Sequence, residues 1–145
     1  MSRTEIINAF SAAMEANDFE QAGTYLDEAF TLSGPTPQPV GKHEFLAMQS
    51  AFQRAFPDWK FNLHGAEERD DIVTGAVQIT GTHTEDLVLP GMPPIPATHK
   101  KVSLPEEHLM FTFKGDRIAS LASDNVPGGG IPGVLQQIGV PIPVM

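Results

Sequence analysis

Carboxylates and an imidazole gather at the two ends of one predicted hairpin. The stretch PEEHLMFTFKGDRIASLASD predicts two strands joined by a Lys-Gly-Asp turn. Glu106, Glu107 and His108 stand at the start of the first strand, and Asp124 stands at the end of the second. Because the strands of a hairpin lie side by side, we expect these groups to meet. A carboxylate beside an imidazole can move protons, so the hairpin predicts general acid–base chemistry.

Side chains alternate between the two faces of the first predicted strand, and either face can line a site. Glu106 and His108 share one face. Glu107 falls on the opposite face, together with Phe111 and Phe113. The second face carries more apolar bulk, which favours its packing against helices. The residues alone therefore leave both faces open.

Each polar group of the hairpin also has an ordinary structural interpretation. Asp124 precedes Asn-Val-Pro, where an aspartate commonly caps a turn. His108 can equally be a half-buried histidine bonded to a backbone carbonyl, and Glu106 can be a solvated strand residue. The histidines show no pairing at metal-ligand spacing, such as His-x-His, so no metal site is predicted.

The length and the composition of the chain indicate one acidic domain. A length of 145 residues suits a single domain at 1–145, with a core at about 2–126 and a tail at 127–145 that covers a pocket or a dimer face. Eighteen acidic against nine basic residues give a net charge of −9, which argues against nucleic acid or a membrane surface as partner. The absence of cysteine excludes a thiol nucleophile. The N-terminal stretch MSRTEIINAF has no apolar signal region, so we expect a cytoplasmic protein.

Helical patterns come first along the chain, and strand patterns follow. Capping boxes at Ser2–Glu5 and Asp18–Gln21 open two helices, and an apolar stripe at 41–55 predicts a third. The remaining chain carries strand patterns and a Pro-rich candidate lid. The predicted strands are 28–33, 59–67, 72–84, 98–113 and 117–124, and the lid is 89–96. Helices followed by long antiparallel strands indicate an α+β fold, with helices on one face of a curved sheet.

Several short stretches in a fixed order carry a resemblance to a known family. They are AFPDW after the third helix, GTHT at a strand end, a Pro-rich loop, the KGDRI hairpin and a closing LQQIG. This order resembles the SnoaL-like polyketide (ester) cyclases, within the nuclear-transport-factor-2-like superfamily. The resemblance implies a cystatin-like α+β cone, in which a curved antiparallel sheet wraps around three N-terminal helices.

The resemblance also implies a chemistry that needs no cofactor. In that family a late-strand aspartate removes a proton alpha to a carbonyl, and the enolate closes a ring on a methyl-ester polyketide. Asp124 stands at the matching place of the base, and His108 with Glu106 two residues before it matches the polar pair near the substrate. The family usually has glutamine where Glu106 stands, and a Trp-Asp context where this chain reads SLASD. On this match we favour the Glu106/His108 face as the one that lines the pocket.

The predicted function is therefore a cofactor-independent cyclase or isomerase acting on a small hydrophobic carbonyl compound. A non-catalytic small-molecule binding module is the alternative, and a hydrolase or dehydratase on the same fold is another. We expect a homodimer through the open sheet face. The predicted substrate-binding residues are Trp59, Phe52, His83, Tyr25 and Met110.

Overall fold

Three helices form within the first 55 residues, as the sequence predicts. The structure is a computed structural model that describes residues 2–34, 38–89, 93–124 and 126–140. Ser2 caps the first helix, and its side chain and that of Glu5 form a reciprocal capping box, which confirms the prediction. The helices are α1 (Arg3–Glu15), α2 (Phe19–Thr24) and α3 (Lys42–Ala55).

A six-stranded curved sheet forms the other layer, with the strand order β2-β1-β8-β7-β4-β3. Its strands are β1 (Leu26–Ser33), β2 (Val40–Gly41), β3 (His64–Arg69), β4 (Ile72–Val77), β7 (Glu107–Lys114) and β8 (Arg117–Ser123). The expectation of a wholly antiparallel sheet is wrong at one pair, because β1 and β8 run parallel. A parallel pair needs a long crossover connection, and here most of the chain lies between the two strands.

Two of the long predicted strands are divided in the structure. The strand pattern at 72–84 gives β4 and then β5 (Thr80–Thr82), and the pattern at 98–113 gives β6 (Lys101–Ser103) and then β7. β5 and β6 pair with each other in a separate two-stranded sheet. Pro105 lies between β6 and β7, and a proline has no N–H for a ladder hydrogen bond.

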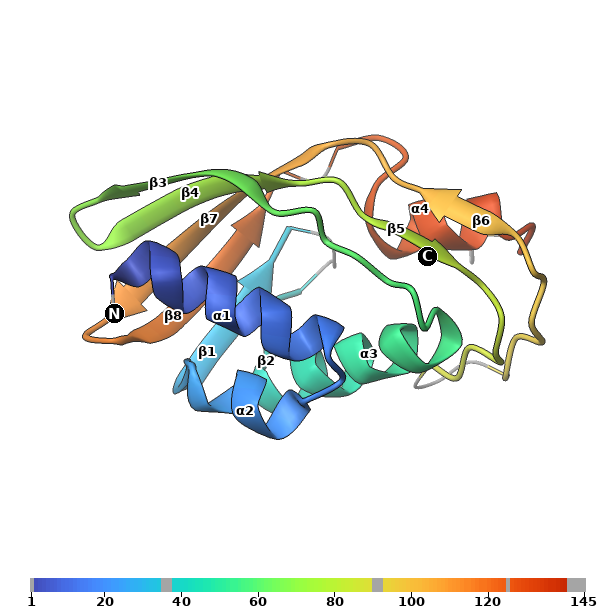
Figure 1. The fold of residues 1–145 in the computed structure, drawn as a ribbon, viewed down its shortest axis with the longest axis horizontal. Coiled ribbons are helices and arrows are strands. Elements are labelled where there is room, and N and C mark those ends of the chain that lie inside the picture. Colours follow the sequence, from blue (N-terminus) through green and yellow to red (C-terminus); the bar gives the residue numbers. More distant parts are fainter. Residues whose placement is uncertain (1, 35–37, 90–92, 125, 141–145) are drawn as a thin grey trace.

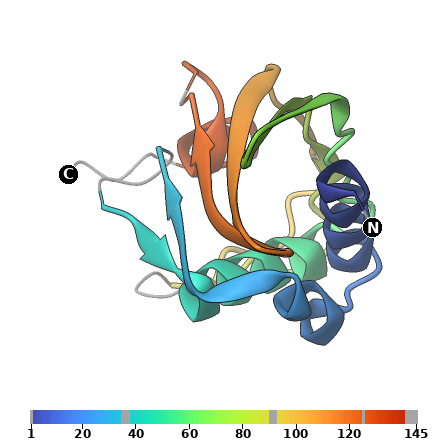
Figure 2. The ribbon, with the colours of Figure 1, turned by 90° about the vertical axis from the view of Figure 1, so that its left-hand side faces the viewer.

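The core lies between the concave face of the large sheet and the helices. Figures 1 and 2 show the strands curving, with α1 and α3 on the inner side of the curve. Buried apolar residues from both layers form one cluster, including Ile7 of α1, Phe52 of α3 and Phe111 of β7. The hydrophobic effect therefore holds the helices inside the curved sheet.

The tail forms a fourth helix, α4 (Gly130–Gln137), beside β6. Gln137 fixes it there, because its side chain exchanges two hydrogen bonds with the backbone of Ser103. Within the described part of the chain, no helix is both long enough and apolar enough to cross a membrane.

Candidate functional site

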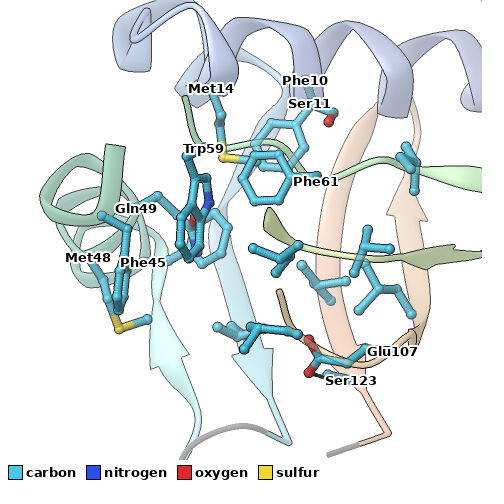
Figure 3. Close-up of a pocket in the computed structure, with 18 of the residues that line it drawn as sticks. Phe10, Ser11, Met14, Phe45, Met48, Gln49, Trp59, Phe61, Glu107 and Ser123 are labelled. Carbon is cyan, nitrogen blue, oxygen red and sulfur yellow. Dashed lines mark hydrogen bonds between the residues drawn. The ribbon is translucent and has the colours of Figure 1, made fainter. Parts of the chain in front are cut away.

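An apolar cavity of about 130 Å³ lies between the concave sheet face and the helices (Figure 3). Its walls come from α1, α3, the segment after α3, strands of the large sheet and α4. The apolar lining residues are Ile7, Phe10, Met14, Leu32, Phe45, Met48, Phe52, Phe61, Leu63, Val77, Ile79, Leu104, Leu109, Phe111, Leu121 and Val134. Its remaining lining residues carry polar groups: Ser11, Gln49, Trp59, Glu107 and Ser123. A mostly apolar hollow with a few polar groups is the usual form of a small-molecule site.

Glu107 is the acid of this cavity. It is the first residue of β7, and only 5% of its surface is exposed. The Ser123 hydroxyl, at the end of β8, donates a hydrogen bond of 3.4 Å to Glu107 Oε1. Figure 3 shows both side chains at one end of the cavity. Glu107 points inward because it alternates in phase with Phe111 and Phe113, which pack into the core.

The backbone that leads into α4 approaches the Glu107 carboxyl closely. A Cβ atom added at Gly129 would lie 3.0 Å from Glu107 Oε1 and 3.1 Å from its Cδ. Glycine at this position therefore allows the tail to cover the carboxyl. Val134 of α4 also contributes to the cavity wall, so the described part of the tail forms part of the site.

Two polar atoms of the cavity lining are buried without a hydrogen-bond partner among the described residues. They are Trp59 Nε1 and Gln49 Oε1. Gln49 lies one helical turn before Phe52 on α3, and the Phe52 ring stacks on the Trp59 indole at 5.2 Å between centroids. Both unpaired atoms therefore belong to the α3 side of the cavity (Figure 3).

The predicted catalytic residues meet, but outside this cavity. His108 Nδ1 lies 3.0 Å from Asp124 Oδ2, and His108 Nε2 lies 3.4 Å from Glu106 Oε1. The side chains of His108, Glu106 and Asp124 are 69%, 49% and 36% exposed. They line an open groove on the outer face of the sheet. The preference for the Glu106/His108 face as the pocket lining is therefore wrong, because the apolar bulk of the other face draws Glu107 inward.

His64 extends this outer cluster. Its Nε2 atom lies 3.1 Å from Glu106 Oε2, and its Nδ1 atom lies 2.7 Å from the carbonyl oxygen of Asn62. The hydrogen bond to the Asn62 carbonyl and the neighbouring Glu106 carboxylate raise the pKa of the His64 imidazole. The cluster is thus a chain of alternating imidazoles and carboxylates in contact with solvent, where water screens its charges. No group of three or more such side chains in the described residues has the geometry to hold a metal ion.

Of the predicted substrate-binding residues, Trp59 and Phe52 line the cavity. The other three do not line this cavity, and their role in substrate binding stays a prediction. Tyr25 follows α2, and its hydroxyl accepts a hydrogen bond from Gln21. Met110 is 42% exposed on the outer face of the sheet, in phase with the outer cluster.

His83 is fully buried in the core, outside the cavity lining. Its ring stacks on Phe56 at 5.1 Å, and its Nδ1 atom accepts a hydrogen bond from the backbone N–H of Thr98. Burial lowers the pKa of the His83 imidazole. The histidine is therefore a neutral core residue in this fold. None of the described residues of the predicted lid at 89–96 lines the cavity, and 90–92 lie outside the described residues.

Sequence reasoning missed Gln49, Ser11 and Ser123 as cavity residues. Gln49 gave a usable signal, because it is a polar residue within the apolar stripe of the third helix. A stronger signal pointed to Glu107 as a cavity residue, because its face of the strand carries more apolar bulk than the Glu106/His108 face. The serines gave none, since a small hydroxyl residue is common on either face of a helix or strand.

Comparisons with known proteins agree with this architecture. The family model of the SnoaL-like polyketide cyclases matches residues 4–123. No curated protein matches the chain. Solved structures of other proteins share the fold, among them the following three.

A SnoaL-like candidate polyketide cyclase from Jannaschia sp. is 14% identical, with a TM-score of 0.73 over 97% of this chain and 93% of that one. AclR from Streptomyces galilaeus, a candidate hydroxylase, is 16% identical, with a TM-score of 0.73 over 94% and 95% of the two chains. A nuclear-transport-factor-2-like protein of unknown function from Cytophaga hutchinsonii is 16% identical, with a TM-score of 0.60 over 85% and 88%. At these identities the structures support the fold alone, which is the nuclear-transport-factor-2-like α+β fold. The family match covers most of the chain, so this protein belongs to the SnoaL-like polyketide cyclase family.

Proposed function

We propose that this protein is a cofactor-independent cyclase or isomerase that acts on a small hydrophobic carbonyl compound in the cavity, with Glu107 as the general base. The observation that carries the proposal is a buried carboxyl, 5% exposed, in an otherwise apolar hollow. Family membership supports a polyketide-like substrate. An apolar site suits proton abstraction from carbon, because a carboxylate with little hydration is a stronger base than one in water.

The reaction begins with removal of a proton from the carbon atom that is alpha to the substrate carbonyl. The Glu107 carboxylate takes the proton, and the electron pair of the broken C–H bond forms the enolate, with the negative charge on oxygen. The hydroxyl of Ser123, which lies beside Glu107, is the neighbouring donor that can turn toward this oxygen. In an isomerase the proton returns to another carbon. In a cyclase the enolate carbon attacks a second carbonyl carbon, and the new alkoxide takes the proton back from Glu107.

A partial reaction tests the base without knowledge of the natural substrate. The ketone 2-indanone has an apolar body and acidic hydrogens alpha to its carbonyl, so a base in the cavity should exchange them for deuterium in D₂O. We expect the protein to accelerate this exchange above the buffer rate, as followed by proton NMR. The fluorescence of Trp59, the single tryptophan, reports occupancy of the cavity in the same samples.

Two amide variants separate the two candidate bases. Glu107→Gln should lower the exchange rate to the buffer rate while 2-indanone still changes the Trp59 fluorescence. Asp124→Asn is the matched control on the outer face, and it should retain exchange. Loss of exchange in Asp124→Asn alone would instead support the predicted Asp124, His108 and Glu106 site. Binding without exchange in the wild-type protein would favour the binding-module alternative.

We also propose that the protein forms a homodimer through the outer face of the sheet. The outer sheet face carries Met110, which is 42% exposed, and Ile72, which is 37% exposed. Sedimentation velocity gives the oligomeric state directly, and a monomer at micromolar concentration would rule the dimer out.

A further inference from the structure

The unpaired polar atoms on the α3 side of the cavity point to the kind of group that a ligand places there. Trp59 is 4% exposed, and its indole N–H has no acceptor among the described residues. Gln49 Oε1, also buried, has no donor there. A buried polar atom without a partner is costly, so each of these atoms calls for a partner that the described residues do not supply, and in a cavity lining a ligand can be that partner.

We infer that Trp59 Nε1 and Gln49 Oε1 form a subsite for a neutral hydroxyl group of the ligand. The indole N–H can only donate, and the amide oxygen can only accept. A hydroxyl both accepts and donates, so a phenol or an enol can satisfy both atoms. A carbonyl or ether oxygen can satisfy only Trp59.

The residue types that line the cavity further restrict the chemical class of the ligand. Among the described residues that line the cavity there is no lysine, arginine or histidine, and Glu107 is the one acid. A carboxylate or phosphate group would therefore enter an apolar site without a cation to pair with it. The subsite is suited to an uncharged ligand whose hydroxyl lies on the α3 side and whose reactive carbon lies nearer Glu107. This orientation rests on the proposed function, whereas the hydroxyl subsite itself does not.

The volume of the cavity sets the size of the part of a ligand that the cavity can enclose. A cavity of about 130 Å³ is close to the engineered apolar cavity of ~150 Å³ that binds benzene. One aromatic ring with a short substituent is therefore the appropriate probe. We choose 4-ethylphenol, 4-ethylanisole and 4-ethyltoluene, which share a body and differ in one group. The first donates and accepts a hydrogen bond, the second only accepts, and the third does neither.

Isothermal titration calorimetry of the three probes tests the subsite. In the wild-type protein we expect 4-ethylphenol to bind at least as tightly as 4-ethyltoluene, although a purely apolar cavity would penalise its buried hydroxyl. Trp59→Phe keeps an aromatic ring against Phe52, and Gln49→Leu keeps a similar size. Each should weaken 4-ethylphenol relative to 4-ethyltoluene about threefold to tenfold, the usual worth of one hydrogen bond, because a change in the shape of the cavity wall affects both probes. Only Trp59→Phe should weaken 4-ethylanisole relative to 4-ethyltoluene.

A second measurement needs no variant that could fail to fold. The single tryptophan gives a single indole N–H peak in a ¹H–¹⁵N spectrum. We expect 4-ethylphenol and 4-ethylanisole to shift this peak downfield, as a new hydrogen bond does, and 4-ethyltoluene to shift it much less. Equal shifts from all three probes would overturn the inference, as would 4-ethyltoluene binding tenfold tighter than 4-ethylphenol. So would the absence of binding by all three probes.

The experiments distinguish failure of the hydroxyl subsite from failure of the proposed function. Glu107→Gln should leave the order of the three affinities unchanged, because Glu107 and Ser123 lie at another end of the cavity from the α3 side (Figure 3). If 2-indanone exchange is absent and the probe order holds, the hydroxyl subsite stands without the reaction. If exchange depends on Glu107 and the probe order fails, the reaction stands without the subsite.

Discussion

Filling the cavity should stabilise the protein and abolish ligand binding. An unfilled apolar cavity costs about 24 cal/mol per Å³, so the volume of about 130 Å³ corresponds to ~3 kcal/mol. Ser11 lies on α1 and lines the cavity, as Figure 3 shows. Ser11→Leu should fill roughly half of the space, which predicts a gain of about 1.5 kcal/mol.

Urea unfolding, followed by circular dichroism, measures this gain. A gain of about 1.5 kcal/mol also predicts a rise in Tm of ~3–6 °C for a chain of this size. Asn8→Leu is the matched control, because Asn8 is an exposed residue of the same helix. Both variants raise helix propensity, but only Ser11→Leu fills the cavity. The difference between the two therefore isolates the contribution of the cavity.

The same variant should lose binding of 4-ethyltoluene and exchange of 2-indanone, because the half of the cavity that remains is much smaller than the ~150 Å³ cavity that binds benzene. Stability gained at the expense of function is a common result at binding sites. If Ser11→Leu is no more stable than Asn8→Leu and still binds 4-ethyltoluene, the cavity is not where the ligand lies.

Three further substitutions test other parts of the structure. Gly133→Ala should lower the free energy of unfolding in urea by about 1–3 kcal/mol, because its Cβ would clash with the Gly128 carbonyl oxygen. Gly41→Ala is the control, since a Cβ there meets no atom within 4 Å, and it should cost less than about 1 kcal/mol. Equal costs of the two substitutions would contradict this packing. Burial lowers the pKa of His83, so the unfolded state binds a proton first as the pH falls below about 6.5, and stability is lost in that range. The non-titrating His83→Gln should lose less stability than the wild-type protein between pH 7 and pH 5, and parallel losses would refute the neutral buried imidazole. Asp124→Asn should change stability by less than about 1 kcal/mol, because its ion pair with an imidazole is exposed; a larger loss at pH 6 would show that the outer cluster is structural.

Local patterns were sufficient to predict the first three helices and the family, but not α4. The capping box at Ser2 and Glu5 involves neighbours in the chain, so the residue types predict the contact. The hairpin likewise brings His108 and Asp124 together, because its register follows from a short turn. The parallel pairing of β1 with β8 could not be read in this way, since it joins strands far apart in the chain.

The sequence by itself determined that a carboxylate and imidazole cluster would form at one end of the last hairpin, and that helices would pack on a curved sheet. Only the tertiary structure decided which carboxyl enters the cavity. Adjacent residues of a strand point to opposite faces of the sheet. The side chains of Glu106 and Glu107 therefore lie on opposite faces, although the two residues are neighbours in the chain. The apolar bulk on the Glu107 face made the difference, and its burial against α1 and α3 is a property of the assembled core rather than of the strand.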